Sequence, residues 1–511
     1  MADQPYPSKR SSLRVKESLA RLYLDFAEKL PKFNGTAIAT LQRIRRHQRK
    51  QAVVAQERAQ PPDGAEISYD HLRLIELFPI EDYTRMERGL RALFPGDSFW
   101  GDRLADFNRT AIGLSNLGNT MLGYVSREKL FLPSEARVLK ELPAEVDTIA
   151  IRLHKILPSA FAVTLDVSFT SSVTKQLRSL QSRCDLPMVK FRSWIPWGMR
   201  AISHSELPAE TVHQQTVVAW LSELRGRIEG VLRPYVNGYF SGSRSVELPS
   251  LPAVEIFTIK GVPPKPEAFE RWLDGASGWL NSLGATPIAI SLYGFKSDDL
   301  LLLAKSGIDS DASARLGFVL DRNGTDNPDQ GDLHLEVEEI LDEALPFLVF
   351  TEFLDRTQVT IEELRRKVYV RLRGASGHRG LRVDFGLNRR IQRESMLLER
   401  FEVEMEQSAG FFRGHSLNKL HSIRTGDPAE GSPGLLDIFL ERIKRHTQFI
   451  KKHLVLASDL FSDHLSWRNL DANYRLQRRL LLWTVVVSVA TIVGLVLPNW
   501  QAIKRFLENF R

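Results

Sequence analysis

The middle of the chain alternates apolar and polar residues in short runs, as half-buried β-strands do. The segments VDTIAIRLHKI and FAVTLDVSFT show this period of two most clearly. Three later segments carry a similar pattern and are predicted to be strands: 253–261, 286–294 and 314–321. Helical spacing separates the strands at 208–233 and 266–283. Because strands alternate with helices over 145–340, we expect a cytosolic α/β or α+β domain there.

The segments on either side of this domain follow the helical period instead. Residues 65–140, which contain LRLIELFPIEDYTRMERGLRALFPG, are predicted to form a mainly helical region. Residues 341–434 are rich in Glu, Leu and Arg and are predicted to form helices joined by loops. Residues 1–60 are predicted to form a basic helical segment, and the turn-forming sequence PPDG separates it from the rest.

From Leu435 onward the chain contains no helix breaker until Pro498, which predicts a long helical stalk over 435–479. Apolar residues recur there every three or four positions, close to the heptad of a coiled coil. This seam consists of Leu436, Leu440, Ile443, Thr447, Ile450, Leu454, Ala457, Phe461 and Leu465. A second copy of the chain could bury the seam in a homo-oligomer, or residues 336–409 could fold back and bury it within one chain.

Residues 480–500 are uncharged and begin with LLLWTVVVSVATIVGLVL. A bilayer core of about 30 Å needs roughly 20 apolar helical residues, so we expect a single C-terminal transmembrane helix here. A short tail follows at 501–511. The interface-prone aromatic residues stand 17 positions apart, roughly 26 Å along a helix and close to the spacing of the two interfacial belts. The residues that mark this anchor are Leu480, Trp483, Gly494 and Trp500.

The composition bears on domain number and compartment. A chain of 511 residues is long enough for two or three folded units. Its one cysteine, Cys184, excludes an intrachain disulfide and suits a reducing compartment. The first thirty residues contain no apolar core followed by a cleavage site, so we expect no signal peptide. The protein is therefore predicted to be a single-pass membrane protein with its N-terminal bulk in the cytoplasm.

The net charge of +7 is concentrated at the start of the chain. Residues 1–58 hold thirteen Lys and Arg against five Asp and Glu, a local balance of +8. Such a segment could attract anionic lipid headgroups, or it could be the solvated face of a packed helix. Nucleic acid is not the expected partner, because no aromatic residues interleave with the arginines. The candidate basic patch is Arg43, Arg45, Arg46, Arg49 and Lys50.

Motifs for chemistry are absent from the sequence. HExxH, GxSxG, a P-loop and a dinucleotide fingerprint are all missing, so we predict no catalytic residue, no metal site and no cofactor. The acidic segment 321–332 places Asp326 where an EF-hand loop needs Gly, and we interpret it as a turn. The residues that would bind a ligand remain unknown.

A long stalk that enters the membrane through NYRLQRRLLLWTVVVSVATIVGLVLP, after an N-terminal α/β domain, resembles the CorA type of divalent-cation transporter. The resemblance covers residues 435–498. That family carries two membrane helices and a Gly-Met-Asn signature after the first. Here Leu497-Pro498-Asn499-Trp500 stands in that place and no second helix follows, so no ion-selecting residue carries over.

These observations favour a non-enzymatic, membrane-anchored sensor or interaction module. Its partners would be the lipid bilayer and possible further copies of itself, with any protein partner unspecified. One alternative is a CorA-like cation channel subunit whose single membrane helix lines a pore in an oligomer. Another is a membrane-tethered enzyme or effector with an unrecognised site in the α/β domain.

Overall fold

The computed structural model describes most of the chain in two compact units. One unit contains Met1–Phe353 with Val403–Ile443, and the other contains Leu354–Glu402 with Lys444–Arg511. The residues that the structure describes are 36–62, 64–94, 119–128, 136–183, 188–193, 203–242, 251–262, 266–283, 291–294, 300–305, 314–320, 330–373, 380–412 and 435–508.

The first unit is built on a mixed sheet of nine strands among the described residues, in the order β3-β2-β4-β5-β1-β8-β11-β10-β9. Most neighbours are antiparallel, whereas β2 with β3 and β8 with β11 are parallel. The strands are β1 (Glu66–Pro79), β2 (Asn119–Ser126), β3 (Ala136–Val138), β4 (Val146–Leu157), β5 (Ala160–Phe169), β8 (Ala253–Lys260), β9 (Ser291–Gly294), β10 (Leu300–Lys305) and β11 (Ala314–Leu320).

The expected strands after residue 145 are confirmed as β4, β5, β8 and β11, and β9 covers the end of the segment 286–294. The two helices expected between them are confirmed as α6 (Ala209–Leu232) and α8 (Pro266–Ser282). The sequence did not predict β6 (Met188–Ser193) and β7 (Ser203–Leu207), which pair as a separate two-stranded sheet.

The prediction of a mainly helical region over 65–140 was wrong. Strand β1 is the fifth of the nine strands in spatial order, and β2 and β3 also come from this region. Helical structure among its described residues is confined to η1 (Ile80–Asp82) and α3 (Tyr83–Leu93). Apolar residues do alternate with polar ones in β1, but a bulge between Tyr69 and His71 shifts the apolar positions from odd to even numbers, which hides the period of two. The sheet domain therefore begins near residue 66 rather than 145.

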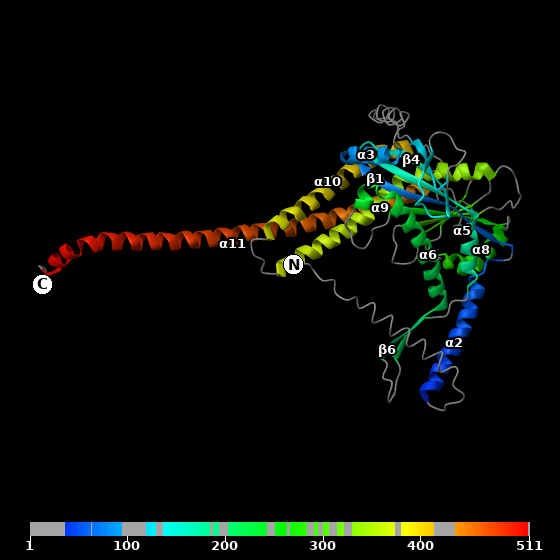
Figure 1. Ribbon diagram of the computed structural model, residues 1–511, viewed down its shortest axis with the longest axis horizontal. Helices are drawn as coiled ribbons and strands as arrows, with labels where there is room; N and C mark the ends of the chain where they lie inside the picture. Colours follow the sequence, from blue (N-terminus) through cyan, green and yellow to red (C-terminus); the bar gives the residue numbers. More distant parts are fainter. Residues whose placement is uncertain are drawn as a thin grey trace. The chain divides into compact units, whose positions relative to one another are not determined.

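Helices α5 (Ser171–Gln181), α6 and α8 pack together beside the sheet, and α2 (Thr36–Arg58) lies against α6 and α8 (Figure 1). On the α5 face Tyr69 of β1 is stacked between Phe169 and Phe257, with both ring centroids 4.7 Å away. The expected basic helical segment thus includes a helix, α2, that packs on the sheet domain. Residues 1–35 lie outside the described residues.

Three long helices follow the sheet: α9 (Gln330–Arg373), α10 (Gly380–Phe412) and α11 (Leu435–Glu508). The expected helical region after residue 341 begins earlier, because α9 starts at Gln330. The predicted stalk, the predicted membrane helix and the described part of the tail form one helix of 74 residues, α11. Pro498, the first helix breaker after Leu435, lies within α11, which continues through it.

In the second unit, α9 and α11 run parallel in a heptad register. His446 donates a hydrogen bond to Gln358 (2.9 Å), and Arg365 donates one to His453 (2.8 Å). Both pairs join residues 88 positions apart, and the two contacts lie one heptad apart on each helix. Helix α10 joins them through an ion pair between Glu402 and Lys451. The seam residues of α11 in this unit, which are Thr447, Ile450, Leu454 and Ala457, are buried within the single chain.

The remainder of α11 is different, because the described side chains from residue 469 to 495 are all exposed. The segment Asn469–Leu495 is long and apolar enough to cross a membrane, with none of its most apolar window buried in the structure. It overlaps most of the anchor expected at 480–500.

Candidate functional site

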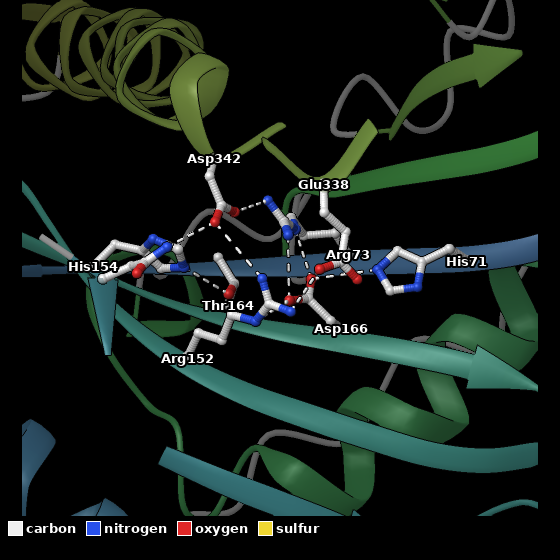
Figure 2. A network of polar contacts seen from close by, with 9 residues as sticks. His71, Arg73, Arg152, His154, Thr164, Asp166, Glu338 and Asp342 are labelled. Carbon is white, nitrogen blue, oxygen red and sulfur yellow. Dashed lines mark hydrogen bonds and ion pairs between the residues drawn. The ribbon is translucent and has the colours of Figure 1, made fainter. Parts of the chain in front are cut away.

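A group of polar residues gathers on one face of the sheet in the first unit, under the start of α9 (Figure 2). Three neighbouring strands each contribute two of them, spaced two apart and hence on the same face. The pairs are His71 and Arg73 on β1, Arg152 and His154 on β4, and Thr164 and Asp166 on β5. Glu338 and Asp342, one turn apart on α9, complete this network.

The centre of the network is the ion pair between Arg73 and Asp166, which lie directly opposite each other on β1 and β5. Arg73 donates from Nε to Oδ1 (2.6 Å) and from Nη2 to Oδ2 (3.3 Å). Burial alone would raise the pKa of the Asp166 carboxyl, but the charge and hydrogen bonds of Arg73, together with the neighbouring His71, lower it well below its ordinary value. Both groups therefore stay charged although they are buried.

Helix α9 is held by the same two arginines. Arg73 uses its remaining nitrogen, Nη1, to donate a hydrogen bond to Oδ1 of Asp342 (2.7 Å). Arg152, which is 20% exposed, donates to Glu338 (2.7 Å) and lies 3.6 Å from the other oxygen of Asp342. Asn119 at the start of β2 also donates to that oxygen (2.8 Å). The N-terminal part of α9 is thus held by side chains of three strands, β1, β2 and β4.

Two histidines border the network. His154 is buried, its Nε2 lies 3.0 Å from the hydroxyl of Thr164, and burial lowers its pKa to about 4. At neutral pH it is therefore an uncharged partner of that hydroxyl. His71 lies on the other side, with its Nε2 3.5 Å from Asp166 (Figure 2).

A second contact holds α10 to the same part of the sheet. The backbone N–H and the hydroxyl of Ser159, in the turn between β4 and β5, both donate to one carboxylate oxygen of Glu404 (3.0 and 2.8 Å). The hairpin that carries Arg152 and Asp166 therefore also binds the C-terminal part of α10.

Pro346 lies one turn beyond Asp342 inside α9. A proline at this position lacks the N–H that would bond to the carbonyl of Asp342, and its ring crowds that carbonyl. The helix is thus intrinsically weakest immediately after the residues that hold it to the sheet.

The opposite face of the sheet holds another buried carboxylate, Glu76. It accepts hydrogen bonds from the backbone N–H groups of Leu77, Phe240 and Ser241, at 3.0, 2.7 and 3.0 Å. Burial raises its pKa, which these hydrogen bonds partly offset. Because its acceptors are used to fix the short helix α7 (Tyr239–Gly242), Glu76 has a structural role.

The network on the α9 face is suited to holding elements together rather than to catalysis. Its two arginines and three carboxylates are paired with one another, and its one hydroxyl beside a base, that of Thr164 next to His154, is buried from solvent. Within the described residues, no group of three or more His, Cys, Asp or Glu side chains is placed to hold a metal ion.

The residues singled out by sequence lie elsewhere. Arg43, Arg46, Arg49 and Lys50 are exposed on α2, while the side chain of Arg45 lies outside the described residues. Leu480, Trp483 and Trp500 are exposed on α11, and a Cβ added at Gly494 would meet no atom within 4 Å. Cys184 and the acidic segment 321–329 also lie outside the described residues.

Sequence reasoning missed the network, although a signal for it exists. In each of β1, β4 and β5, two polar residues at positions i and i+2 interrupt an apolar run. Such a pair places both polar groups on one sheet face, and buried charges need partners. The pairing itself depends on the strand order, which the sequence pattern does not specify.

Comparisons with models of known protein families, with curated proteins and with solved structures found no match. The resemblance of the stalk to CorA-type transporters therefore stays a prediction.

Proposed function

We propose that this chain is a membrane-anchored cytosolic module that senses or relays a state of its sheet domain, rather than an enzyme. One observation carries the proposal: α9 bears the network residues Glu338 and Asp342 in its first turns and pairs with α11 through Gln358 and Arg365. A change in how α9 is held on the sheet would therefore reach the helix that carries the apolar segment.

The exposed apolar segment of α11 supports the membrane part of the proposal. Contiguous apolar surface of this length on a soluble monomer would be an aggregation liability, whereas in a bilayer it is solvated by lipid. With the N-terminal bulk in the cytoplasm, the segment would cross once and leave a short tail on the far side.

Self-association belongs to the same proposal, and we place it in the membrane segment. The seam residues Thr447, Ile450, Leu454 and Ala457 are buried within the chain, which argues against this part of the seam as the surface for a second copy. Ala490 and Gly494 lie one turn apart in the membrane segment, and small residues at that spacing allow close helix packing in lipid. Substitution Gly494→Ile should shift crosslinked protein in mild detergent toward monomer.

Membrane integration is tested by placing charges in the segment. An arginine near the bilayer centre costs about 2.5 to 3.5 kcal/mol on the insertion scale, so Val487→Arg combined with Ile492→Arg should move the protein into the carbonate-extractable fraction. Val455→Arg, on an exposed position of the coiled-coil part of α11, is the matched control and should stay in the membrane. Wild-type protein that carbonate already extracts would refute the anchor.

A further inference from the structure

Helix α2 presents two opposite faces with different chemistry. Its inner face repeats at steps of four and three and is buried, through Gln48, Ala52, Ala55 and Ala59. Ala52 and Ala55 pack against Ala209 at the start of α6. At the C-terminal end of α2 the approach to α8 is close, since a Cβ on Gly278 would lie 2.8 Å from the carbonyl oxygen of Arg58. This packing determines which face of α2 is buried and which face is exposed.

The outer face of α2 carries cations followed by apolar residues. Arg43, Arg46 and Lys50 follow one another at steps of three and four and are all exposed. The same stripe continues into Val53 and Val54, which are 50% and 45% exposed. At 100° per residue these positions lie on the side of the helix away from Ala52 and Ala55. We call these five residues the α2 stripe.

We propose that the α2 stripe docks on an anionic lipid surface. The charge is complementary, because α2 lies in the part of the sequence that carries a local excess of +8. The exposed valine pair continues the stripe, so the cations can attract anionic headgroups while the two valines bury apolar surface at the headgroup boundary, and these two contributions add in interfacial binding. The phosphates of a nucleic acid could pair with the cations, but a nucleic acid has no apolar layer that would bury the two valines. The stripe also has no aromatic side chain on which a base could stack.

The proposed contact of α2 with lipid is separate from the membrane contact of α11, and a fluorophore attached to α2 reports on it alone. His47 is exposed and neighbours the stripe, so His47→Cys in a Cys184→Ser background gives one labelling site on the full-length protein. An environment-sensitive fluorophore there should shift to the blue in phosphatidylcholine–phosphatidylglycerol vesicles. It should not shift in vesicles of phosphatidylcholine alone, and high salt should weaken the response.

The matched variants separate the stripe from overall charge. Arg43→Gln, Arg46→Gln and Lys50→Gln together should abolish the shift, because three cations account for about a hundredfold in partition to an anionic surface. Lys140→Gln, Lys175→Gln and Arg183→Gln remove the same charge from other exposed positions of the first unit and should leave the shift intact. Val53→Ser with Val54→Ser should keep the salt-dependent attraction but reduce the blue shift.

Docking of α2 and anchoring by α11 can fail independently, and the measurements tell the two failures apart. Protein that resists carbonate extraction but shows no lipid-dependent shift would refute docking of α2 and leave the anchor standing. Protein that is extracted yet still shows the shift with added anionic vesicles would refute the anchor and support docking. A shift caused by RNA in detergent, with none from anionic vesicles, would overturn the assignment to lipid.

Discussion

Arg73 and Asp166 face each other across β1 and β5, and their side chains form a two-point ion pair that is buried from solvent. The remaining nitrogen of Arg73 reaches Asp342 on α9. One guanidinium group thus joins the centre of the sheet to α9, whose later part pairs with α11. A paired and hydrogen-bonded charge of this kind fixes position more than it adds stability.

Removing one charge of this pair should be strongly destabilising. Asp166→Asn leaves Arg73 buried with only its contact to Asp342, which should lower the free energy of unfolding of the first unit by about 3–5 kcal/mol. Urea unfolding of the full chain in mild detergent measures this loss. Asp147→Asn, an exposed position on the adjacent strand β4, is the control and should change stability by less than about 0.5 kcal/mol.

Stability should depend on pH through His154. Its pKa is about 4 in the folded protein, against an ordinary value of 6.5. Between these values only the unfolded chain takes up the proton, so the free energy of unfolding should fall by about 3 kcal/mol as pH drops from about 6.5 to about 4.

The comparison with His154→Gln isolates this contribution, because glutamine can still bond to the hydroxyl of Thr164 without titrating. Burial raises the pKa values of Glu76 and Glu255, which favours the folded state as pH falls. The wild type and the His154→Gln variant both contain these two groups, so their effect cancels in the comparison. The wild type should therefore lose more stability than the variant over this range. Equal pH dependence in the two proteins would contradict the account of His154.

Two glycines should respond oppositely to the same substitution. A Cβ on Gly238 would lie 2.4 Å from the carbonyl oxygen of Leu77 and 2.8 Å from Cγ of Glu76, so Gly238→Ala should destabilise the protein and displace α7. Gly230 is exposed in α6 with no atom within 4 Å of such a Cβ. Gly230→Ala should therefore stabilise by up to about 1 kcal/mol, as helix propensity predicts. Thermal unfolding of the two variants against the wild type measures both effects.

The pairing of α11 with α9 in the second unit can be tested with neighbouring leucines on α11. Leu454 is 4% exposed and Leu456 is 44% exposed. Leu454→Asp should speed amide hydrogen exchange in residues 446–457, because it buries an unpaired charge. Leu456→Asp should leave exchange there unchanged. If the particle mass of Leu454→Asp fell to half or less without local unfolding, the seam would lie between copies of the chain instead.

Segments in which apolar residues recur with a clear period could be predicted from the sequence. Strands β4 and β5 and helices α6 and α8 carry clear periods of two or near 3.6, and α11 lacks breakers over most of its length. Strand β1 was not recognised, because the bulge between Tyr69 and His71 shifts the phase of its alternation. The network around Arg73 could not be predicted for another reason: its residues come from positions 71 to 342, and only the strand order brings them together.

We propose that the contacts between the sheet and the N-terminal part of α9 control the pairing of α9 with α11. Hydrogen exchange of residues 446–457, measured in proteoliposomes for Asp342→Asn and for the exposed control Glu339→Gln, tests it most directly. Loss of the Asp342 charge weakens the contacts of Arg73 and Arg152, so exchange in 446–457 should quicken in that variant alone. Exchange in 446–457 that matches the wild type, while the peptides of β1 and β5 exchange faster, would contradict the claim.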